Sequence, residues 1–150
     1  WDEIKKQEKA LNKSNKPKSA IEVPAGMPAL QRAHKIGEKT KKFGFDWEKA
    51  SQVLSQLKAE IVELEEVLHE QTNEKIEHEM GDVLFSAAQL ARHLDIEPEA
   101  ALRNTNRRFL GRFEKMLEIG KVTAQQFQEL SSEKKEELWG QAKKALSASK

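Results

Sequence analysis

Hydrophobic residues recur at every third or fourth position along most of the chain, which is the period of an amphipathic α-helix. No run of residues alternates between apolar and polar positions in the way that predicts a β-strand. The pattern and its capping residues therefore predict an all-α fold, a helical bundle of about five to six helices. The expected helices are Trp1–Leu11, Ala29–Phe43, Glu48–Glu70, Glu74–Leu94, Pro98–Gly120, a short one after a Thr123–Gln126 capping box, and a last one capped by Ser131 or Ser132.

A polar, turn-forming stretch separates the first expected helix from the others. Residues 12–19 read N-K-S-N-K-P-K-S, and V-P-A-G-M-P follows shortly after them. We therefore expect an N-terminal helix and linker over residues 1–28, followed by one domain over residues 29–150. The turn G-F-D-W supplies Asp46 as the expected cap of the next helix. Because the chain starts with Trp instead of Met, we expect it to be a fragment or a processed chain.

The expected helices Glu48–Glu70 and Glu74–Leu94 distribute their apolar residues differently. The first has one apolar stripe, with Glu60 just inside its edge and Glu63 at its border. The second is apolar nearly all round, with Phe85 opposite its core stripe, so it should be buried and covered on every side. We therefore expect a homodimer or a higher homo-oligomer. The expected core residues are Leu54, Leu57, Ile61, Leu64 and Leu68 in the first helix, and Ile76, Met80, Val83, Ala87, Leu90 and Leu94 in the second.

Two pairs of acidic residues stand on these two helices. The first pair is Glu60 and Glu63, and the second, fifteen residues further on, is Glu79 and Asp82. Residues three apart are neighbours on a helix surface, so each pair presents two carboxylates together. A buried carboxylate costs several kcal/mol unless a cation or strong hydrogen bonds compensate it. We therefore expect antiparallel helices to bring the four acids together around a divalent ion.

The residue types of this expected site indicate which ion it binds. Four carboxylates, without cysteine and without an obligatory histidine, favour a hard cation, Mg²⁺ first and Mn²⁺ as a substitute. The chain has no cysteine, which excludes disulfides and thiolate metal sites and is compatible with a cytoplasmic location. We expect no role for His69, His78 and His93, and His34 is unassigned.

Charge and hydropathy limit the classes of partner. No apolar run approaches the roughly 20 residues that span a bilayer, so no membrane partner is expected. The formal net charge is +1, but residues 60–82 carry nine acids and one base, and residues 103–115 carry five bases and one acid. Local poles of opposite sign on a near-neutral chain suggest an anionic ligand held through a metal, and we expect no nucleic-acid partner.

Several longer strings now identify a resemblance. The spacing E-x-x-E, fifteen residues, E-x-x-D occurs together with E-M-G-D-V-L-F, N-R-R-F-L-G-R-F and E-E-L-W. With P-A-L-Q-R-A-H-K-I and G-F-D-W before them, these strings resemble the catalytic domain of the MazG family, which has the all-α NTP pyrophosphatase fold. Members often carry two related domains, and this chain resembles the C-terminal one. The resemblance implies that residues 29–150 are a MazG-like catalytic domain.

Site roles follow from the resemblance by position. It implies Mg²⁺ ligation by Glu60, Glu63, Glu79 and Asp82, and nucleotide contacts by Lys75, Arg108, Arg112 and Trp139. This chain departs from the family pattern at two places. Ala59 stands where the family usually has a further glutamate, and Gln56 stands where it often has a lysine.

The reaction that the resemblance implies is Mg²⁺-dependent hydrolysis of a nucleoside triphosphate to a monophosphate and pyrophosphate, in nucleotide-pool control or house-cleaning. Glu60 or Glu63 is the expected catalytic group that orients or deprotonates water. Trp139 is the expected stacking partner of the base, from the same chain or from a partner subunit.

Two other classes of protein stay open at this stage. A di-iron carboxylate bundle needs Glu-x-x-His on two helices, and the chain has one such pair, Glu66 and His69. A non-catalytic helical interaction or dimerisation module would need no metal at all.

Overall fold

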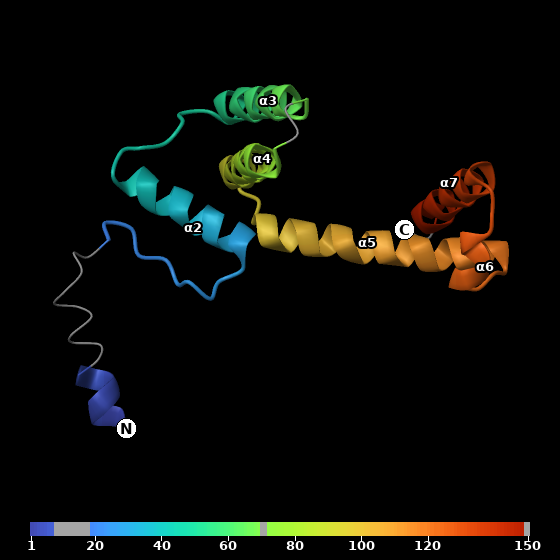
Figure 1. The fold of residues 1–150 in the computed structure, drawn as a ribbon, viewed down its shortest axis with the longest axis horizontal. Helices are drawn as coiled ribbons and strands as arrows, with labels where there is room; N and C mark the ends of the chain where they lie inside the picture. The colour runs from blue at the N-terminus through green and yellow to red at the C-terminus, as the bar shows by residue number, and fades with distance from the viewer. Residues whose placement is uncertain (8–18, 70–71, 149–150) are drawn as a thin grey trace. The chain divides into compact units, whose positions relative to one another are not determined.

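The computed structural model describes residues 1–7, 19–69 and 72–148. Within these ranges every regular element is a helix, as Figure 1 shows, so the all-α prediction is confirmed. Residues 2–7 are helical; residues 8–18, which hold the end of the first expected helix and most of the linker, lie outside the described ranges. The other helices are α2 (Ala29–Lys42), α3 (Ala50–Val67), α4 (Asn73–His93), α5 (Pro98–Gly120), α6 (Ala124–Gln128) and α7 (Ser132–Ala148).

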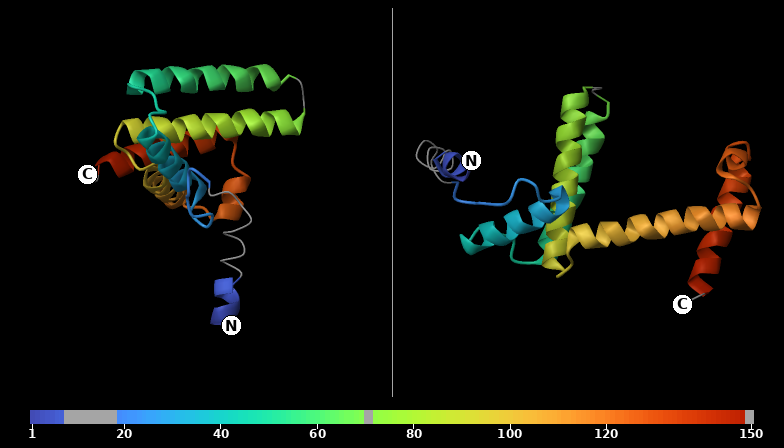
Figure 2. Two further views of the ribbon diagram at one scale, coloured as in Figure 1. Left: turned by 90° about the vertical axis from the view of Figure 1, so that its left-hand side faces the viewer. Right: turned by 90° about the horizontal axis from the view of Figure 1, so that it is seen from below.

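The chain divides into two compact units, Trp1–Pro98 and Glu99–Lys150. In the first unit α3 and α4 form an antiparallel hairpin and lie side by side, as both views of Figure 2 allow the reader to follow. Helix α2 packs against α4 in the same unit. No helix in the described ranges combines the length and the apolar character that crossing a membrane requires.

The backbone N–H groups in the turn before α3 are satisfied by a different residue from the one predicted. The side-chain oxygen of Gln52 accepts from the backbone N–H groups of Glu48 and Lys49, at 2.9 and 3.1 Å, and α3 begins at Ala50. Asp46 does not cap the helix, so that expectation was wrong. Its carboxylate instead accepts two hydrogen bonds from the guanidinium of Arg92 on α4, at 2.6 and 2.9 Å. The turn is therefore tied to α4 instead of to α3.

Helix α2 approaches α4 closely at Gly37. A Cβ atom at this position would collide with the side chains of Gln89 and Arg92. Gln89 is 1% exposed, and its amide nitrogen donates to the backbone oxygen of Ala33 on α2 at 2.8 Å. Its amide oxygen accepts from Arg92 at 2.8 Å, so every heavy polar atom of this buried side chain has a partner. The absence of a side chain at Gly37 thus permits a buried polar connection between the two helices.

The face that α3 turns toward α4 differs from the predicted stripe. Val53 is fully buried, whereas Leu54, Ile61 and Leu68, expected in the core, are 40, 47 and 53% exposed. The helix is rotated so that its partly or fully buried positions include Glu60 itself. These positions are Ala50, Val53, Gln56, Leu57, Glu60, Leu64 and Val67.

Helix α4 is also less buried within this chain than its composition predicts. Ile76, Val83 and Leu90 are half-buried as expected, but other expected core residues are exposed. Met80 is 40% exposed, whereas Ala88, which is not among the expected core residues, is 1% exposed. The hairpin therefore has large apolar side chains that stay exposed among the described residues. They are Leu54, Ile61, Val62, Leu68, Met80, Leu84 and Phe85.

The second unit has its own small core. Met116 on α5 and Leu138 and Ala142 on α7 are buried together, with Phe113 and Phe127 packed against them. The expected capping box of the short helix is present, with reciprocal Thr123–Gln126 hydrogen bonds of 2.9 and 3.1 Å. The hydroxyl of Ser131 accepts from the backbone N–H of Lys134, which confirms one of the two predicted caps for the last helix.

Candidate active site

Helix α3 places Glu60 on the side that faces α4. One of its carboxylate oxygens, Oε1, accepts a hydrogen bond of 2.7 Å from the amide of Gln56, one turn earlier. The other oxygen, Oε2, is shielded from solvent and has no hydrogen-bond partner within the described residues. An ionised oxygen in this position is costly unless a cation approaches it. The neutral amide of Gln56 therefore orients the Glu60 carboxylate without neutralising it.

Three carboxylates meet across the hairpin. Glu60, Glu63 and Glu79 each offer an oxygen, and these three oxygens lie within 4.8 Å of one another. We call this group the interhelical cluster. Glu79 resembles Glu60 in having one oxygen, Oε2, that is shielded from solvent and lacks a hydrogen-bond partner among the described residues. Both unpaired oxygens thus belong to the same cluster.

The electrostatics of Glu63 reflect this crowding. The pKa of Glu63 is raised above its ordinary value, first through a hydrogen bond with the Glu60 carboxyl group, then through the negative charge of Glu60 and of Glu79. Like charges held together disfavour ionisation, and a divalent cation at the centre would reverse that effect.

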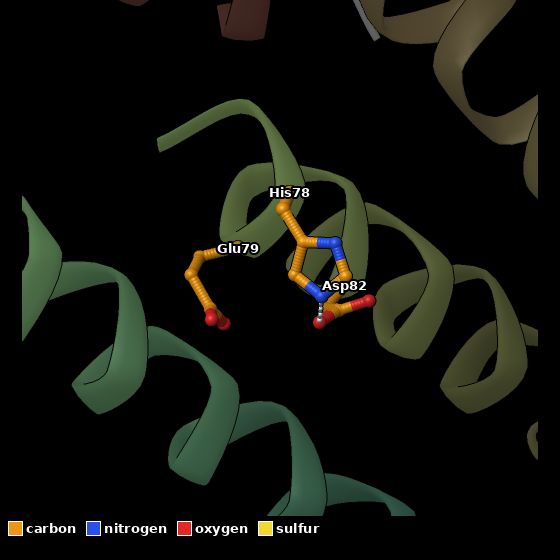
Figure 3. A group of neighbouring side chains, drawn as sticks. All are labelled: His78, Glu79 and Asp82. Atoms are coloured by element: carbon orange, nitrogen blue, oxygen red, sulfur yellow. Dashed lines mark ion pairs between the residues drawn. The ribbon is translucent and has the colours of Figure 1, made fainter. Parts of the chain in front are cut away.

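A second group of possible ligands lies on α4 alone. The side chains of His78, Glu79 and Asp82 offer ligand atoms within 4.8 Å of one another. Figure 3 shows the carboxylates of Glu79 and Asp82 extending from the helix in the same direction, with the imidazole of His78 beside Asp82. The Nε2 atom of His78 lies 3.4 Å from an oxygen of Asp82. We call this the α4 cluster, and Glu79 belongs to both clusters.

The ligand atoms of these two clusters can be compared with those that a divalent cation takes in proteins. Oxygen ligands from several carboxylates are what Mg²⁺ and Mn²⁺ take from proteins, and two of these oxygens are shielded without a donor. The residues therefore fit such an ion. The four predicted acids do not gather in one group, however. Asp82 joins Glu79 and His78, whereas Glu60 and Glu63 join Glu79 from the other helix.

The nucleotide contacts implied by the resemblance fall in both units. Lys75 is exposed in the first turn of α4. In the second unit Arg108 is exposed and donates to the hydroxyl of Thr105 at 3.0 Å. The Arg112 guanidinium lies 5.6 Å from the centre of the Trp139 ring, which also packs 5.7 Å from Phe109. Arg112 and Trp139 are thus brought together within the second unit, and Arg108 does not take part in their contact.

The half-buried Trp139 ring lines an aromatic cavity of the second unit. The cavity has a volume of about 300 Å³ and combines ring faces with one acidic and one basic side chain. A planar base can stack in such a place, because every base has a π-face. Its lining residues are Phe109, Phe113, Met116, Phe127, Lys135, Glu136 and Trp139.

Two residues near the carboxylates have no role in the sequence-based interpretation. His78 stands four positions before Asp82, and Gln56 stands four positions before Glu60. Residues four apart are neighbours on a helix surface, so the same spacing rule that found the acids could have found both. By contrast, the Glu66–His69 pair of the di-iron alternative is exposed at both positions and contributes to neither cluster.

Comparison with known proteins finds a family model that matches the part of the chain holding these carboxylates. The MazG nucleotide pyrophosphohydrolase domain model matches residues 48–116, the range that holds all four acids and Arg112. The chain is 38% identical over 143 residues to the nucleoside triphosphate pyrophosphohydrolase/pyrophosphatase MazG of Thermotoga maritima, covering 95% of the chain and 54% of that protein. It is 35% identical over 150 residues to the nucleoside triphosphate pyrophosphohydrolase of Escherichia coli, covering 96% of the chain and 55% of that protein. The chain therefore spans about half the length of these curated relatives, and its residues 48–116 match the domain of the MazG family.

Proposed function

We propose that this chain hydrolyses nucleoside triphosphates between the α and β phosphates, releasing a nucleoside monophosphate and pyrophosphate in the presence of Mg²⁺. The observation that carries the proposal is the pair of shielded, unpartnered oxygens of Glu60 and Glu79 in one three-carboxylate cluster. Such a cluster suits a cation that in turn attracts the negatively charged triphosphate. The names of the relatives, both nucleoside triphosphate pyrophosphohydrolases, support this substrate class.

The carboxylates of the interhelical cluster would have two different roles, binding the cation and orienting the attacking water. A divalent cation, when bound, would neutralise charge on the phosphates and lower the pKa of a coordinated water. Glu60 and Glu79 would hold it, with Gln56 fixing the orientation of Glu60. Glu63 is exposed and is not one of the two carboxylates with a shielded, unpartnered oxygen, so its carboxylate stays accessible to a water molecule. We therefore assign to Glu63 the orientation or deprotonation of the attacking water, with Glu60 as the alternative.

The cationic and aromatic residues would bind the rest of the substrate. Trp139 would supply the half-buried ring on which the base stacks, and Arg112 lies over that ring in a cation–π contact. Arg108 and Lys75, both exposed, would contact phosphate oxygens through charge-assisted hydrogen bonds. These four roles are assigned by position in the family pattern.

We further propose that the chain works as a homodimer or a higher homo-oligomer. Phe85 and Met80 on α4 are 41 and 40% exposed, and Leu54 and Ile61 on α3 are 40 and 47% exposed. An apolar face of this kind on a helical hairpin is typical of a surface that another helix covers. In a cell the proposed role is control of the nucleotide pool in the cytoplasm.

A panel of nucleoside triphosphates with Mg²⁺ tests the function. Pyrophosphate and orthophosphate are measured separately, because cleavage between the α and β phosphates releases the first and cleavage at the γ phosphate releases the second. We expect pyrophosphate with every substrate that is turned over, and no reaction when EDTA removes the ion. Orthophosphate alone, or turnover that EDTA does not change, would contradict the proposal.

A further inference from the structure

A cavity of about 380 Å³ lies within the first unit and is lined from α2, the turn after it and α4. A cavity of this size that combines apolar walls with a few polar groups is typical of a small-molecule site. None of the acids in the two carboxylate clusters lines it, so it is separate from the expected metal site. Its lining residues are Ile36, Gly37, Thr40, Phe45, Asp46, Trp47, Phe85 and Gln89.

Three aromatic side chains belong to this lining. The backbone N–H of Trp47 donates to the Asp46 carboxylate at 2.9 Å, and the Trp47 ring packs edge-on against His93, with ring centres 6.3 Å apart. Asp46 is fixed in turn by its ion pair with α4. Phe45 and Phe85 are 80 and 41% exposed, although both line the cavity. The cavity thus has one ring that is held in place and two rings that a ligand can cover.

Gln89 gives the cavity a buried polar group. Its side chain is 1% exposed, its amide oxygen accepts from Arg92, and its amide nitrogen donates to the backbone oxygen of Ala33. A guanidinium only donates and a carbonyl oxygen only accepts, so these partners fix which amide atom is the nitrogen. The nitrogen carries two N–H bonds, and among the described residues it donates only the one to Ala33. A buried N–H without an acceptor is unfavourable, so a ligand that supplies an acceptor here would be stabilised.

Thr40 supplies an acceptor at the same cavity. Its hydroxyl donates to the backbone oxygen of Gly37 at 3.1 Å, and its own oxygen can still accept a hydrogen bond. The cavity therefore offers aromatic faces, one N–H donor and one hydroxyl acceptor. A nucleobase matches this combination, because it is a planar ring with both acceptors and donors along its edges.

The position of the cavity on α4 relates it to the proposed reaction. Phe85 follows Asp82 by three residues, so the two side chains are neighbours on the helix surface. The cavity therefore begins about one helical turn, roughly 5 Å along the axis, from the acids of α4. In a nucleotide only the sugar separates the base from the α phosphate. A phosphate near the carboxylates thus leaves the base within reach of the cavity.

We propose that this cavity binds the nucleobase of the substrate, with its ring against Phe45 and Trp47 and one of its acceptor atoms at the second N–H of Gln89. The inference rests on the proposed function and deepens it, because it assigns the base preference to residues outside the carboxylate clusters. A base has two faces, so this contact leaves one face for a stacking partner such as Trp139.

Nucleosides, which lack phosphates, test the cavity apart from the reaction. Adenosine, guanosine, cytidine and thymidine are each titrated into the ¹⁵N-labelled full chain without added metal. The probe is the side-chain NH₂ group of Gln89, whose second proton moves downfield when it gains an acceptor. We expect at least one nucleoside to shift this signal in a saturable way. No response of the Gln89 signal to any of the four would overturn the proposal.

Phe45→Ala tests the aromatic contact. Phe45 is 80% exposed, so the variant should fold like the wild type. We expect nucleoside binding to weaken, and KM for the triphosphate to rise, by about 5-fold to 150-fold, as for the loss of one stacking ring. The kcat should change by less than about twofold, because the carboxylates are untouched. Phe43→Ala is the matched control, since Phe43 is 70% exposed and does not line the cavity. Unchanged KM in Phe45→Ala would overturn the proposal.

Thr40→Val tests the polar contact, because it keeps the shape of the side chain and removes the hydroxyl. A site that hydrogen-bonds its ligand discriminates by that bond, so we expect the order of preference among the four bases to change. The same order in wild type and variant would remove Thr40 from the base site.

Two other occupants of the cavity would give different results. A nucleoside site that is independent of the substrate would show as a nucleoside that shifts the Gln89 signal without competing with the triphosphate. A second copy of the chain in the cavity would show as a changed mass of Phe45→Ala in light scattering with unchanged KM. Either result would overturn the proposal. Failure of the proposed function would show separately, as absent pyrophosphate release from a chain whose Gln89 signal still responds to nucleosides.

Discussion

Glu60 and Glu79 approach each other from antiparallel helices, each with one carboxylate oxygen shielded from solvent and without a hydrogen-bond partner among the described residues. Two ionised groups in this relationship repel one another, and neither has a compensating donor at that oxygen. The arrangement therefore costs stability in the absence of a cation. A bound cation would remove this repulsion, so we expect its binding to stabilise the native state.

Replacing Glu79 by glutamine should abolish pyrophosphate release while leaving the helix content unchanged. The substitution keeps the shape of the side chain and removes the charge that both clusters share. We expect activity to fall at least about 100-fold, beyond the range seen when only an outer partner of a ligand is lost. Circular dichroism and a pyrophosphate assay measure the two effects. Glu77→Gln is the control, because Glu77 is exposed on the same helix and lies in neither cluster. Near-normal turnover by Glu79→Gln would remove Glu79 from the metal site.

The melting temperature should respond to Mg²⁺ through the same residue. A ligand that binds only the native state stabilises by mass action, by about 2.7 kcal/mol at a concentration of 100 times its Kd. We expect several degrees of stabilisation in the wild type and almost none in Glu79→Gln or Asp82→Asn. Differential scanning fluorimetry with Ca²⁺-free Mg²⁺ and with matched ionic strength measures this. Equal shifts in wild type and variants would indicate that the ion acts nonspecifically.

The features of this structure that depend on short-range spacing were predicted better than those that depend on long-range contacts. The acid pairs, the Thr123–Gln126 box and the order of helices depend on residues within a few positions of one another, and the structure contains all of them. The rotation of α3 was not predictable in the same way. Positions 53 and 54 are both apolar, Val53 and Leu54, and only the packing of α3 against α4 determines which of the two is buried.

The capping role expected for Asp46 shows the same limit. Its residue type suits a helix cap, but α3 begins at Ala50 with Lys49 as its N-cap, so Asp46 lies too far before the helix to cap it. Arg92, forty-six residues later, instead donates to both of its oxygens in a charge-assisted, bidentate pair. His78 is the opposite case, because its neighbour Asp82 is only four residues away and can be identified from the sequence. The sequence nevertheless led us to expect no role for His78, because carboxylates alone suit the expected Mg²⁺.

The Asp46–Arg92 pair should make stability depend on acid pH. Two hydrogen bonds from Arg92, together with one of 3.0 Å from His93, hold the pKa of Asp46 well below its usual range despite burial, which alone would raise it. A carboxyl whose pKa is lower in the folded state stabilises the protein above its unfolded pKa of about 3.8. That contribution is lost as pH falls below this value toward the folded pKa.

Asp46→Asn measures the contribution directly. The side chains of Asp46 and Arg92 are 10 and 8% exposed, so the variant leaves a nearly buried guanidinium without its counter-charge. We expect a loss of about 3 kcal/mol in the free energy of unfolding at pH 7, and a smaller difference from wild type at pH 3. Urea unfolding at both pH values measures it. Asp95→Asn serves as control, since Asp95 is exposed and its φ of 58° suits asparagine. A difference from wild type that is equal at the two pH values would contradict the assignment.

Trp139→Leu should weaken nucleotide binding without affecting the metal. Base–aromatic stacking contributes about 1–3 kcal/mol, so we expect KM to rise between about 5-fold and 150-fold. The Mg²⁺-dependent shift in melting temperature should stay as in the wild type, because both carboxylate clusters lie on α3 and α4. Trp139→Phe keeps an aromatic face and should lie between the two. Unchanged KM in Trp139→Leu would show that the ring serves only the core of its unit, next to Phe109.

Phe85→Glu should weaken self-association and activity together. Phe85 is 41% exposed on the hairpin, where Met80 and Leu84 are also exposed, and a charge there opposes burial against a second copy. Phe43→Glu is the matched control, because Phe43 is 70% exposed just beyond α2, outside the hairpin. Light scattering at micromolar concentration gives the mass of each protein, and the pyrophosphate assay gives its activity. If the apolar face is covered by a partner subunit, the wild type is at least a dimer and Phe85→Glu loses both properties, whereas Phe43→Glu keeps both. A wild-type monomer that hydrolyses nucleotides would show that the active site is complete within one chain and that the exposed face serves another purpose.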